Sequence, residues 1–170
     1  LRATTIVLVA GLTWQEILEG LQAQDGQTQL RLYAVPGPQG SMLLDDSYNA
    51  SPESTIAALN LLDDLDAEKR VAVLGDMLEL GPFEHQGHIS VGTRARHVVD
   101  LLVTVGELGS LIAEGALKAG MTKSEIVQCR DSKHALNYLS NNIGMGDVVL
   151  IKGSRGLGLD RLVNNLEILA

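Results

Sequence analysis

The chain has 170 residues, of which 45% are hydrophobic and only 3% aromatic, so we expect one ordinary domain with an aliphatic core. The formal net charge of -8 argues against a general binder of nucleic acids or anionic membranes, because such proteins normally carry a basic face. The single cysteine, Cys129, cannot build a disulfide framework or a cysteine-based metal site, and it fits a reducing, cytoplasmic setting.

The first 25 residues differ in pattern from those that follow. The apolar run at 5–12 is too short to cross a bilayer and only Arg2 precedes it, so we expect neither membrane insertion nor a signal peptide. Residues 3–24 have the apolar spacing of two helical pieces. Because the chain begins with Leu and not Met, we expect it to be part of a longer protein, with residues 1–25 ending a preceding unit.

The rest of the chain predicts an α/β fold. Residues 29–35 alternate like a strand, 36–40 favour a turn and 41–45 favour a second strand, which together predict a hairpin. Unbroken apolar strands then alternate with helices, a pattern typical of a mostly parallel sheet covered on both faces. We therefore expect a Rossmann-like three-layer sandwich with an antiparallel edge hairpin strand. The later strands are expected at 71–75, 101–106, 126–129 and 148–151, and the helices after 52, near 85–97, over 108–120, from 131 or 132 to 143, and over 159–169.

Polar groups follow four of these expected strands, at the sheet edge where open α/β sheets bind ligands. They are Asp45-Asp46, Gly75-Asp76, Gly106-Glu107 and Lys152-Gly153-Ser154-Arg155.

The acidic pair Asp45-Asp46 has several interpretations. It could bind a metal, accept hydrogen bonds from a ribose or orient a basic side chain, because adjacent carboxylates repel unless something compensates them. Alternatively, one carboxylate caps the turn and the other is solvated. Tyr48 and Asn49 could face a planar ligand or form an ordinary exposed turn. Ser51-Pro52 predicts a helix start, with Ser as the N-cap and Pro in the first helical position.

The glycine-rich loop at 152–156 joins the last strand to the last helix. Its glycines would let the backbone approach a ligand, and Lys, Ser, Arg and the following helix N-terminus favour an anion such as a carboxylate or phosphate. The alternative is a solvated basic turn. Neither G-x-x-x-x-G-K-[ST] nor a G-x-G-x-x-G after the first strand occurs in the chain, so both standard nucleotide fingerprints are missing.

Two further polar residues are better explained by structural roles. Asp76 lies in an apolar loop between Gly75 and Gly81, whose glycines suggest special backbone angles, and it is interpreted as a helix cap or a loop staple. His88, together with His85, lacks a third metal ligand at suitable spacing and is interpreted as a structural histidine.

Four motifs in a fixed order resemble the C-terminal domain of the Mur ligase family. They are Asp45–Pro52, Leu74–Gly81, His88 with Gly92, and Ile151–Gly156. The resemblance implies that residues 26–170 form this domain and that residues 1–25 end the central ATPase domain of the family.

The resemblance also implies ATP-driven amide formation. In the family, a peptide carboxylate becomes an acyl phosphate, an amine displaces the phosphate, and Mg²⁺ screens the charge. The motifs are most similar to those of ligases that add D-alanyl-D-alanine to UDP-N-acetylmuramoyl-tripeptide in peptidoglycan synthesis; a relative that adds another amino acid is the alternative. The phosphate loop and metal ligands lie in upstream domains of the family, so this chain alone is expected to be inactive. The C-terminal domain swings in to complete the site.

Site residues follow by position in the motifs. Asp46 resembles the carboxylate that reaches the ATP ribose, and Tyr48-Asn49 would line the nucleotide side. The incoming dipeptide would be held, through its carboxylate, by Lys152, Ser154 and Arg155. Two departures concern the nucleotide contacts: Gln27 follows Gly26 where the family has Arg, and Ser51 replaces the second Asn of the turn.

A phosphoacceptor receiver domain of signalling proteins is the rival interpretation. Its acidic pair, phosphoacceptor Asp, hydroxyl residue and Lys are imitated by Asp45-Asp46, Asp76, Thr104 and Lys152. Against it, Gly follows Lys152 where receivers usually have Pro, and the acidic pair is unusually close to Asp76 in sequence.

Overall fold

The computed structural model describes residues 32–170. The helical pieces expected at 3–24, the boundary between residues 25 and 26, and the Gln27 departure lie outside the described residues.

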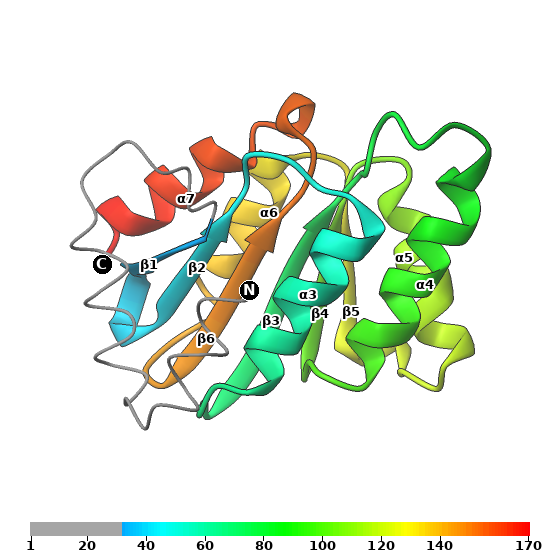
Figure 1. The fold of residues 1–170 in the computed structure, drawn as a ribbon. Helices are drawn as coiled ribbons and strands as arrows, with labels where there is room; N and C mark the ends of the chain where they lie inside the picture. Colours follow the sequence, from blue (N-terminus) through cyan, green and yellow to red (C-terminus); the bar gives the residue numbers. More distant parts are fainter. Residues whose placement is uncertain (1–31) are drawn as a thin grey trace, which may run out of the picture.

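Within residues 32–170, six strands form one sheet in the order β1-β2-β6-β3-β4-β5 (Figure 1). β1 runs antiparallel to β2, and all the other neighbouring pairs are parallel. The predicted mostly parallel sheet with an antiparallel hairpin strand at its edge is thus confirmed. The strands are β1 (Tyr33–Pro36), β2 (Met42–Asp46), β3 (Lys69–Gly75), β4 (Leu101–Val105), β5 (Ile126–Cys129) and β6 (Asp147–Lys152).

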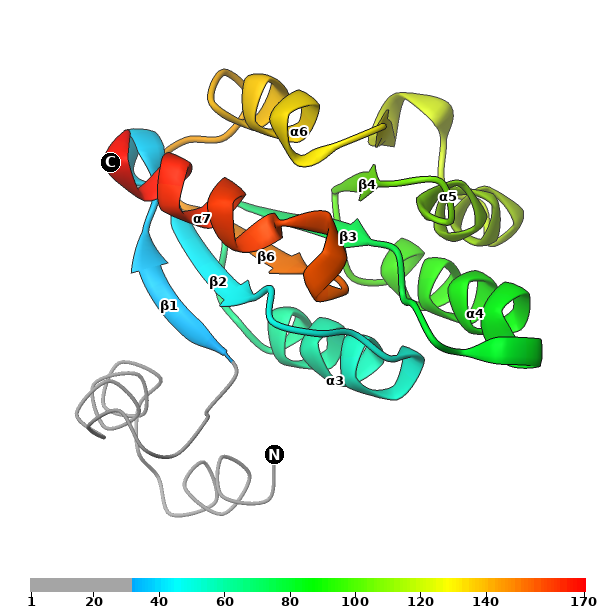
Figure 2. The same ribbon diagram turned by 90° about the horizontal axis from the view of Figure 1, so that it is seen from above.

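The helices cover both faces of the sheet, as the pattern predicted (Figure 2). One face carries α3 (Pro52–Asp63), α4 (Glu84–Arg96) and α5 (Gly109–Lys118), and the other carries α6 (Ser132–Leu139) and α7 (Leu159–Ile168). Within residues 32–170, no helix combines the length and the apolar character that crossing a bilayer requires.

Successive side chains of the central strands point alternately into two separate cores. Leu44 and Leu74 point into the core under α3, α4 and α5, whereas Leu43 and Val73 point into the core under α6 and α7. All four side chains are essentially inaccessible to water. Because each central strand contributes side chains to both cores, its sequence is a continuous apolar run.

Several of the predicted element boundaries needed small corrections. Pro36, placed in the turn from sequence, ends β1; an edge strand tolerates a proline because one side of it needs no ladder hydrogen bonds. β2 ends at Asp46, one residue later than expected. α6 ends at Leu139, and Ile143, expected inside that helix, packs into the core from the following loop.

The order of the strands creates a topological switch point at β6. β6 lies between β2 and β3, which both lead into helices on the α3–α4 face, whereas β6 leads into α7 on the opposite face (Figures 1 and 2). Loops that diverge in this way leave a crevice at the carboxyl ends of the strands, where open α/β sheets bind ligands. The predicted site residues lie at this edge.

Candidate functional site

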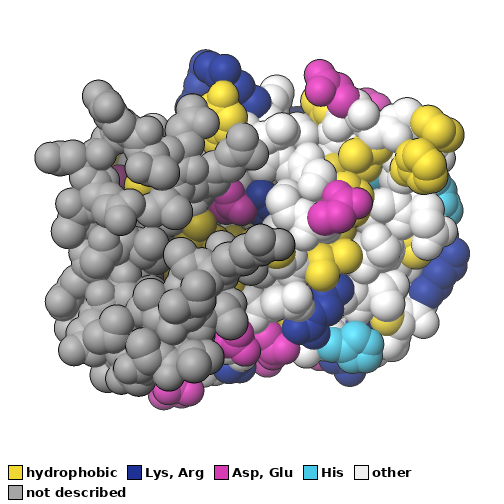
Figure 3. All heavy atoms as spheres, in the orientation of Figure 1, with side chains coloured by type: hydrophobic (Ala, Val, Ile, Leu, Met, Phe, Trp, Pro, Cys, Tyr) yellow, Lys and Arg dark blue, Asp and Glu magenta, His cyan; other side chains and the backbone are white. Residues whose placement is uncertain are grey.

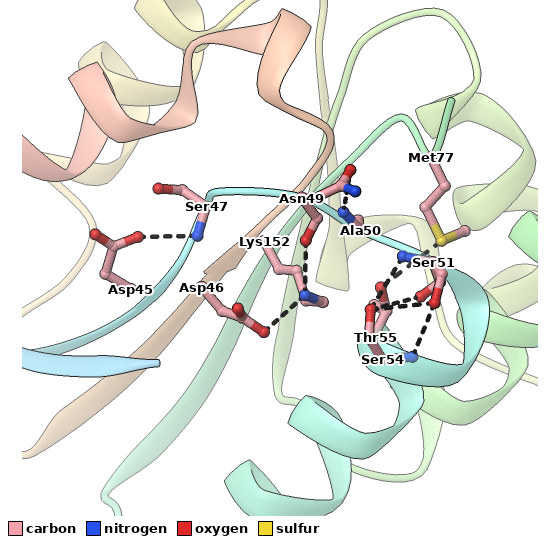
Figure 4. A network of polar contacts seen from close by, with 10 residues as sticks. All are labelled: Asp45, Asp46, Ser47, Asn49, Ala50, Ser51, Ser54, Thr55, Met77 and Lys152. Atoms are coloured by element: carbon pink, nitrogen blue, oxygen red, sulfur yellow. Dashed lines mark hydrogen bonds and ion pairs between the residues drawn. The ribbon is translucent and has the colours of Figure 1, made fainter. Parts of the chain in front are cut away.

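A buried ion pair joins the ends of β2 and β6. The Lys152 ammonium donates to Asp46 Oδ2 over 2.7 Å and to the main-chain oxygen of Asn49 over 2.9 Å (Figure 4). The two residues are direct partners in the parallel ladder, and both are buried, Lys152 to 2% exposure and Asp46 to 7%. Of the alternatives open for the acidic pair, Asp46 therefore takes the one in which a carboxylate engages a basic side chain.

The other carboxylate has a local role. Asp45 Oδ1 accepts a hydrogen bond from the Ser47 amide over 2.9 Å, so Asp45 caps the turn after β2. Asn49 makes a similar local bond, in which its Oδ1 accepts from the Ala50 amide. These bonds shape the turn that carries Tyr48, a residue that is 48% exposed.

Ser51 starts α3 in the predicted way. Its hydroxyl oxygen accepts from the Ser54 amide over 3.2 Å, and the Ser54 hydroxyl oxygen accepts from the Ser51 amide over 3.0 Å. Pro52 occupies the first helical position, where its missing N–H costs nothing. At Ser51, where the motif departs from the family, the side chain thus serves as a helix cap.

The loop after β6 is attached to the loop after β3. The Ser154 hydroxyl oxygen accepts from the Leu78 amide over 2.9 Å, and the Ser154 amide donates to the main-chain oxygen of Asp76 over 3.0 Å. A Cβ on Gly153 would lie 2.7 Å from Leu159 and 3.1 Å from the Gly75 Cα. Gly153 therefore allows the close approach of the backbone of β3, and the approach of a ligand to the glycines of this loop stays a prediction.

Arg155 faces outward from the same loop. It begins the short 3-10 helix η4 (Arg155–Leu157), and its guanidinium carbon lies 5.7 Å from the centre of the Tyr48 ring, within the range of a cation–π contact. Arg155 and Tyr48 are both exposed, so the two loops present an aromatic ring and a guanidinium side by side. The edge toward which the parallel strands point in Figure 1, the upper margin in Figure 3, carries charged side chains of both signs.

Asp76 is a loop staple at a helix start, as predicted. Its Oδ1 accepts from the Gly109 amide over 2.8 Å at the beginning of α5, and the residue is 8% exposed. A Cβ on Gly106, which has φ +100°, would lie 2.4 Å from the carboxylate oxygens. A receiver domain needs an accessible phosphoacceptor and an all-parallel sheet, whereas Asp76 is buried and β1 runs antiparallel to β2 at the edge of this sheet.

The burial of Asp76 predicts a pH-dependent stability. Desolvation raises the pKa of this carboxyl above its usual 3.8, although nearby amides, led by that of Gly109, and His88 oppose the shift. The folded state then holds this proton more tightly than the unfolded state, so its contribution to stability falls as the pH rises from 3.8 through the raised pKa. Urea unfolding across that range should show that the unfolding free energy of Asp76→Asn, relative to that of the wild type, increases as the pH rises. A difference that is independent of pH would contradict this.

His88 is a satisfied structural histidine, as predicted. Its Nε2 accepts from the Met77 amide over 3.0 Å, which places the ring proton on Nδ1, and Nδ1 donates to the main-chain oxygen of Glu84 over 2.6 Å. The side chain is fully buried. In the part of the chain that the structure describes, no group of three or more His, Cys, Asp or Glu side chains could hold a metal ion.

The six predicted site residues thus gather at one edge of the sheet but differ in accessibility. Tyr48, Asn49 and Arg155 are exposed, whereas Asp46, Lys152 and Ser154 are buried and bonded to neighbouring loops. Their roles toward ligands stay predictions. The pairing of Lys152 with Asp46 was not predicted from the sequence. One signal was present, because Lys152 directly follows the apolar run Val148–Ile151, which indicates that Lys152 lies at the end of a buried strand.

Comparisons with known proteins agree with this geometry. Residues 30–155 match the model of the Mur ligase, glutamate ligase domain family. The chain is 38% identical over 141 residues to the UDP-N-acetylmuramoyl-tripeptide–D-alanyl-D-alanine ligase of Bacillus subtilis, covering 82% of this chain and 31% of the relative. It is 30% identical over 167 residues to the ligase of that name from Synechocystis, covering 98% of this chain and 36% of the relative. The chain thus spans about one third of the length of these relatives.

Solved structures show the same likeness. The crystal structure of MurF ligase from Thermotoga maritima in complex with ADP matches with a TM-score of 0.69 and 27% identity, over 86% of this chain and 32% of that one. A crystal structure of MurF from Acinetobacter baumannii matches with a TM-score of 0.72 and 28% identity, over 95% of this chain and 35% of that one. The chain belongs to the Mur ligase family, and the part described here is a C-terminal domain of that family.

Proposed function

We propose that this chain is the C-terminal domain of an ATP-dependent ligase that adds D-alanyl-D-alanine to UDP-N-acetylmuramoyl-tripeptide through an acyl phosphate. The relatives reported above carry that name, and the Thermotoga maritima structure is a complex with ADP. The observation that carries the proposal is the joining of two motif loops, after β2 and after β6, at one edge of the sheet by the Asp46–Lys152 pair.

The two exposed groups of the site suit the two ligands of such a reaction. The exposed Tyr48, on the turn after β2, offers an aromatic side chain to the nucleotide half of the site. Arg155 offers a planar guanidinium that can bind a carboxylate through two hydrogen bonds, which suits the carboxylate of the incoming dipeptide. Because Arg155 lies over the ring, the nucleotide half and the dipeptide half of the site adjoin each other.

The described residues suit ATP better than its metal ion. Asp46 and Tyr48 supply a carboxylate and an aromatic face for a nucleoside, and ATP supplies the phosphoryl group that activates the substrate carboxylate. A cluster of metal ligands, by contrast, is lacking over residues 32–170. We therefore assign the binding of Mg²⁺ and of the phosphates to the central ATPase domain of the full-length enzyme. The nucleotide-sugar substrate and the buried free thiol of Cys129 suit a cytoplasmic setting.

The proposal is tested by phosphate release from the full-length enzyme that contains this chain. Release is expected only when ATP, UDP-N-acetylmuramoyl-tripeptide and D-alanyl-D-alanine are all present. The 170-residue chain alone is expected to release none. An enzyme that responds to a single amino acid and not to the dipeptide would overturn the substrate assignment in favour of a related ligase.

Arg155→Ala is expected to raise the KM for D-alanyl-D-alanine roughly tenfold in the full-length enzyme, because the dipeptide carboxylate loses a charge-assisted contact. The KM for ATP should change by less. Steady-state kinetics with each substrate varied in turn measures both constants.

Arg130→Ala is the matched control for this prediction. The Arg130 side chain is 88% exposed and pairs with Asp131 at the far end of the sheet, so its loss should leave both constants near their wild-type values. An unchanged dipeptide KM in Arg155→Ala would remove Arg155 from the site.

A further inference from the structure

We propose that Lys152 is a positioning residue for the nucleotide half of the site and acts through Asp46, so that it does not contact the dipeptide. The inference rests on the proposed function. It reassigns Lys152, which the family resemblance places with Ser154 and Arg155 at the dipeptide, to the nucleotide half.

The first support is the direction of the Lys152 side chain. Its ammonium has three N–H donors, and two of them are used by Asp46 Oδ2 and the main-chain oxygen of Asn49. Both partners belong to the end of β2 and the turn after it, which Figure 4 shows on the side toward which Lys152 points. The exposure of Lys152 is only 2%, so in this conformation its ammonium presents almost no surface to a dipeptide.

The second support is the rigidity of the base from which Lys152 reaches. Its backbone is paired with Asp46 of β2 on one side and with Leu74 of β3 on the other, in the middle of the sheet. From this fixed point, the side chain holds a carboxylate and a carbonyl that are three residues apart. The side-chain bonds from Asp45 to Ser47 and from Asn49 to Ala50, by contrast, stay within the turn.

The third support is the contrast with the rest of the loop. Ser154 is bonded to the β3 loop through Leu78 and Asp76, and only Arg155 points outward. The loop thus has an inner part that fixes neighbouring loops and one outer cationic group. Lys152 belongs to the inner part, and the carboxylate that it orients is the one assigned to the ATP ribose.

Kinetics of the full-length enzyme separate this role from a dipeptide contact. Lys152→Met is expected to raise the KM for ATP roughly tenfold and to change the KM for D-alanyl-D-alanine less than about twofold. Asp46→Asn should raise the KM for ATP as well. The double variant should resemble Asp46→Asn alone, because residues that act as one unit show non-additive effects. Lys118→Met, which removes a 66% exposed lysine from a surface ion pair, is the matched control.

The outcomes distinguish this inference from the proposed function. A Lys152→Met enzyme whose dipeptide KM rises more than its ATP KM, or a double variant with additive effects, would overturn the positioning role and leave the proposed function intact. An Asp46→Asn enzyme with an unchanged KM for ATP would overturn the nucleotide assignment of Asp46 and the inference with it. The proposed function itself depends on D-alanyl-D-alanine-dependent phosphate release by the wild type, which is a separate measurement.

A second measurement on the wild-type enzyme covers the case in which Lys152→Met does not fold. Reductive methylation with formaldehyde, followed residue by residue by peptide mass spectrometry, should modify Lys152 at least about tenfold more slowly than Lys118, because a buried, paired ammonium is protected. Saturating D-alanyl-D-alanine should leave the Lys152 rate unchanged. Modification as fast as that of Lys118, or protection by the dipeptide, would contradict the inference.

Discussion

Gly92→Ala is expected to lower the unfolding free energy of the domain by about 3 kcal/mol or more, since overpacking against fixed backbone has no cheap relief. A Cβ at this position of α4 would lie 1.9 Å from the main-chain oxygen of Ile112 in α5. A main-chain oxygen cannot rotate away as a side chain can, so the two helices would have to separate. Urea unfolding followed by circular dichroism measures the loss.

The opposite helix shows the same constraint. A Cβ at Gly115 of α5 would lie 2.3 Å from the main-chain oxygen of Ile89 in α4, so the two helices cross at a pair of glycines. The separation would also affect the site, because α4 carries His88, which holds the Met77 amide in the loop after β3.

Gly144→Ala is the matched control for Gly92→Ala. Gly144 has an ordinary φ, and its nearest potential neighbour, the Gln39 side-chain oxygen, would be 3.9 Å from the new Cβ. We expect this variant to stay within about 0.5 kcal/mol of the wild type. A Gly92→Ala domain as stable as the control would mean that the helix crossing is looser than the structure indicates.

Signals that act over a few residues were predicted correctly from the sequence. Ser51-Pro52 started a helix because N-capping and the fixed φ of proline depend on neighbours one to three positions away. The helices on both faces of the sheet were predicted from the unbroken apolar strands, because a strand that is buried on both sides has no alternating polar positions. Asp131, one of the two positions at which α6 was expected to begin, is its N-cap for a similarly local reason.

Features that depend on the order of the strands could not be predicted. Asp46 and Lys152 are 106 residues apart, and they meet only because β6 enters the sheet between β2 and β3. No local pattern specifies that insertion. The sequence therefore showed a cationic loop, and it could not show that its lysine turns inward to a carboxylate on the neighbouring strand.

Gly75 and Gly81, at the two ends of the loop after β3, show the same limit. Gly81 adopts φ +54°, as the prediction of special backbone angles for this loop requires. For Gly75 that prediction is wrong, because its φ is not positive. A side chain is excluded there by packing, since a Cβ would lie 2.4 Å from Leu157 Cδ1 in the loop after β6. A sequence marks both positions with the same residue, and only the tertiary structure separates a backbone requirement from a close approach.

Lys152→Met is expected to lower the unfolding free energy of the domain by about 3–5 kcal/mol, because it leaves the buried Asp46 carboxylate without its cation. The double variant Asp46→Asn with Lys152→Met should recover part of this loss, since no charge then remains to be desolvated. Lys118→Met, at an exposed ion pair, should cost at most about 1 kcal/mol. Urea unfolding at low and high salt separates the two cases, because salt screens an exposed pair far more than a buried one. A Lys152→Met domain that loses no more than the Lys118 control would show that water reaches the pair. In that case the Asp46 carboxylate would be oriented by solvent and not by the strand on which Lys152 lies.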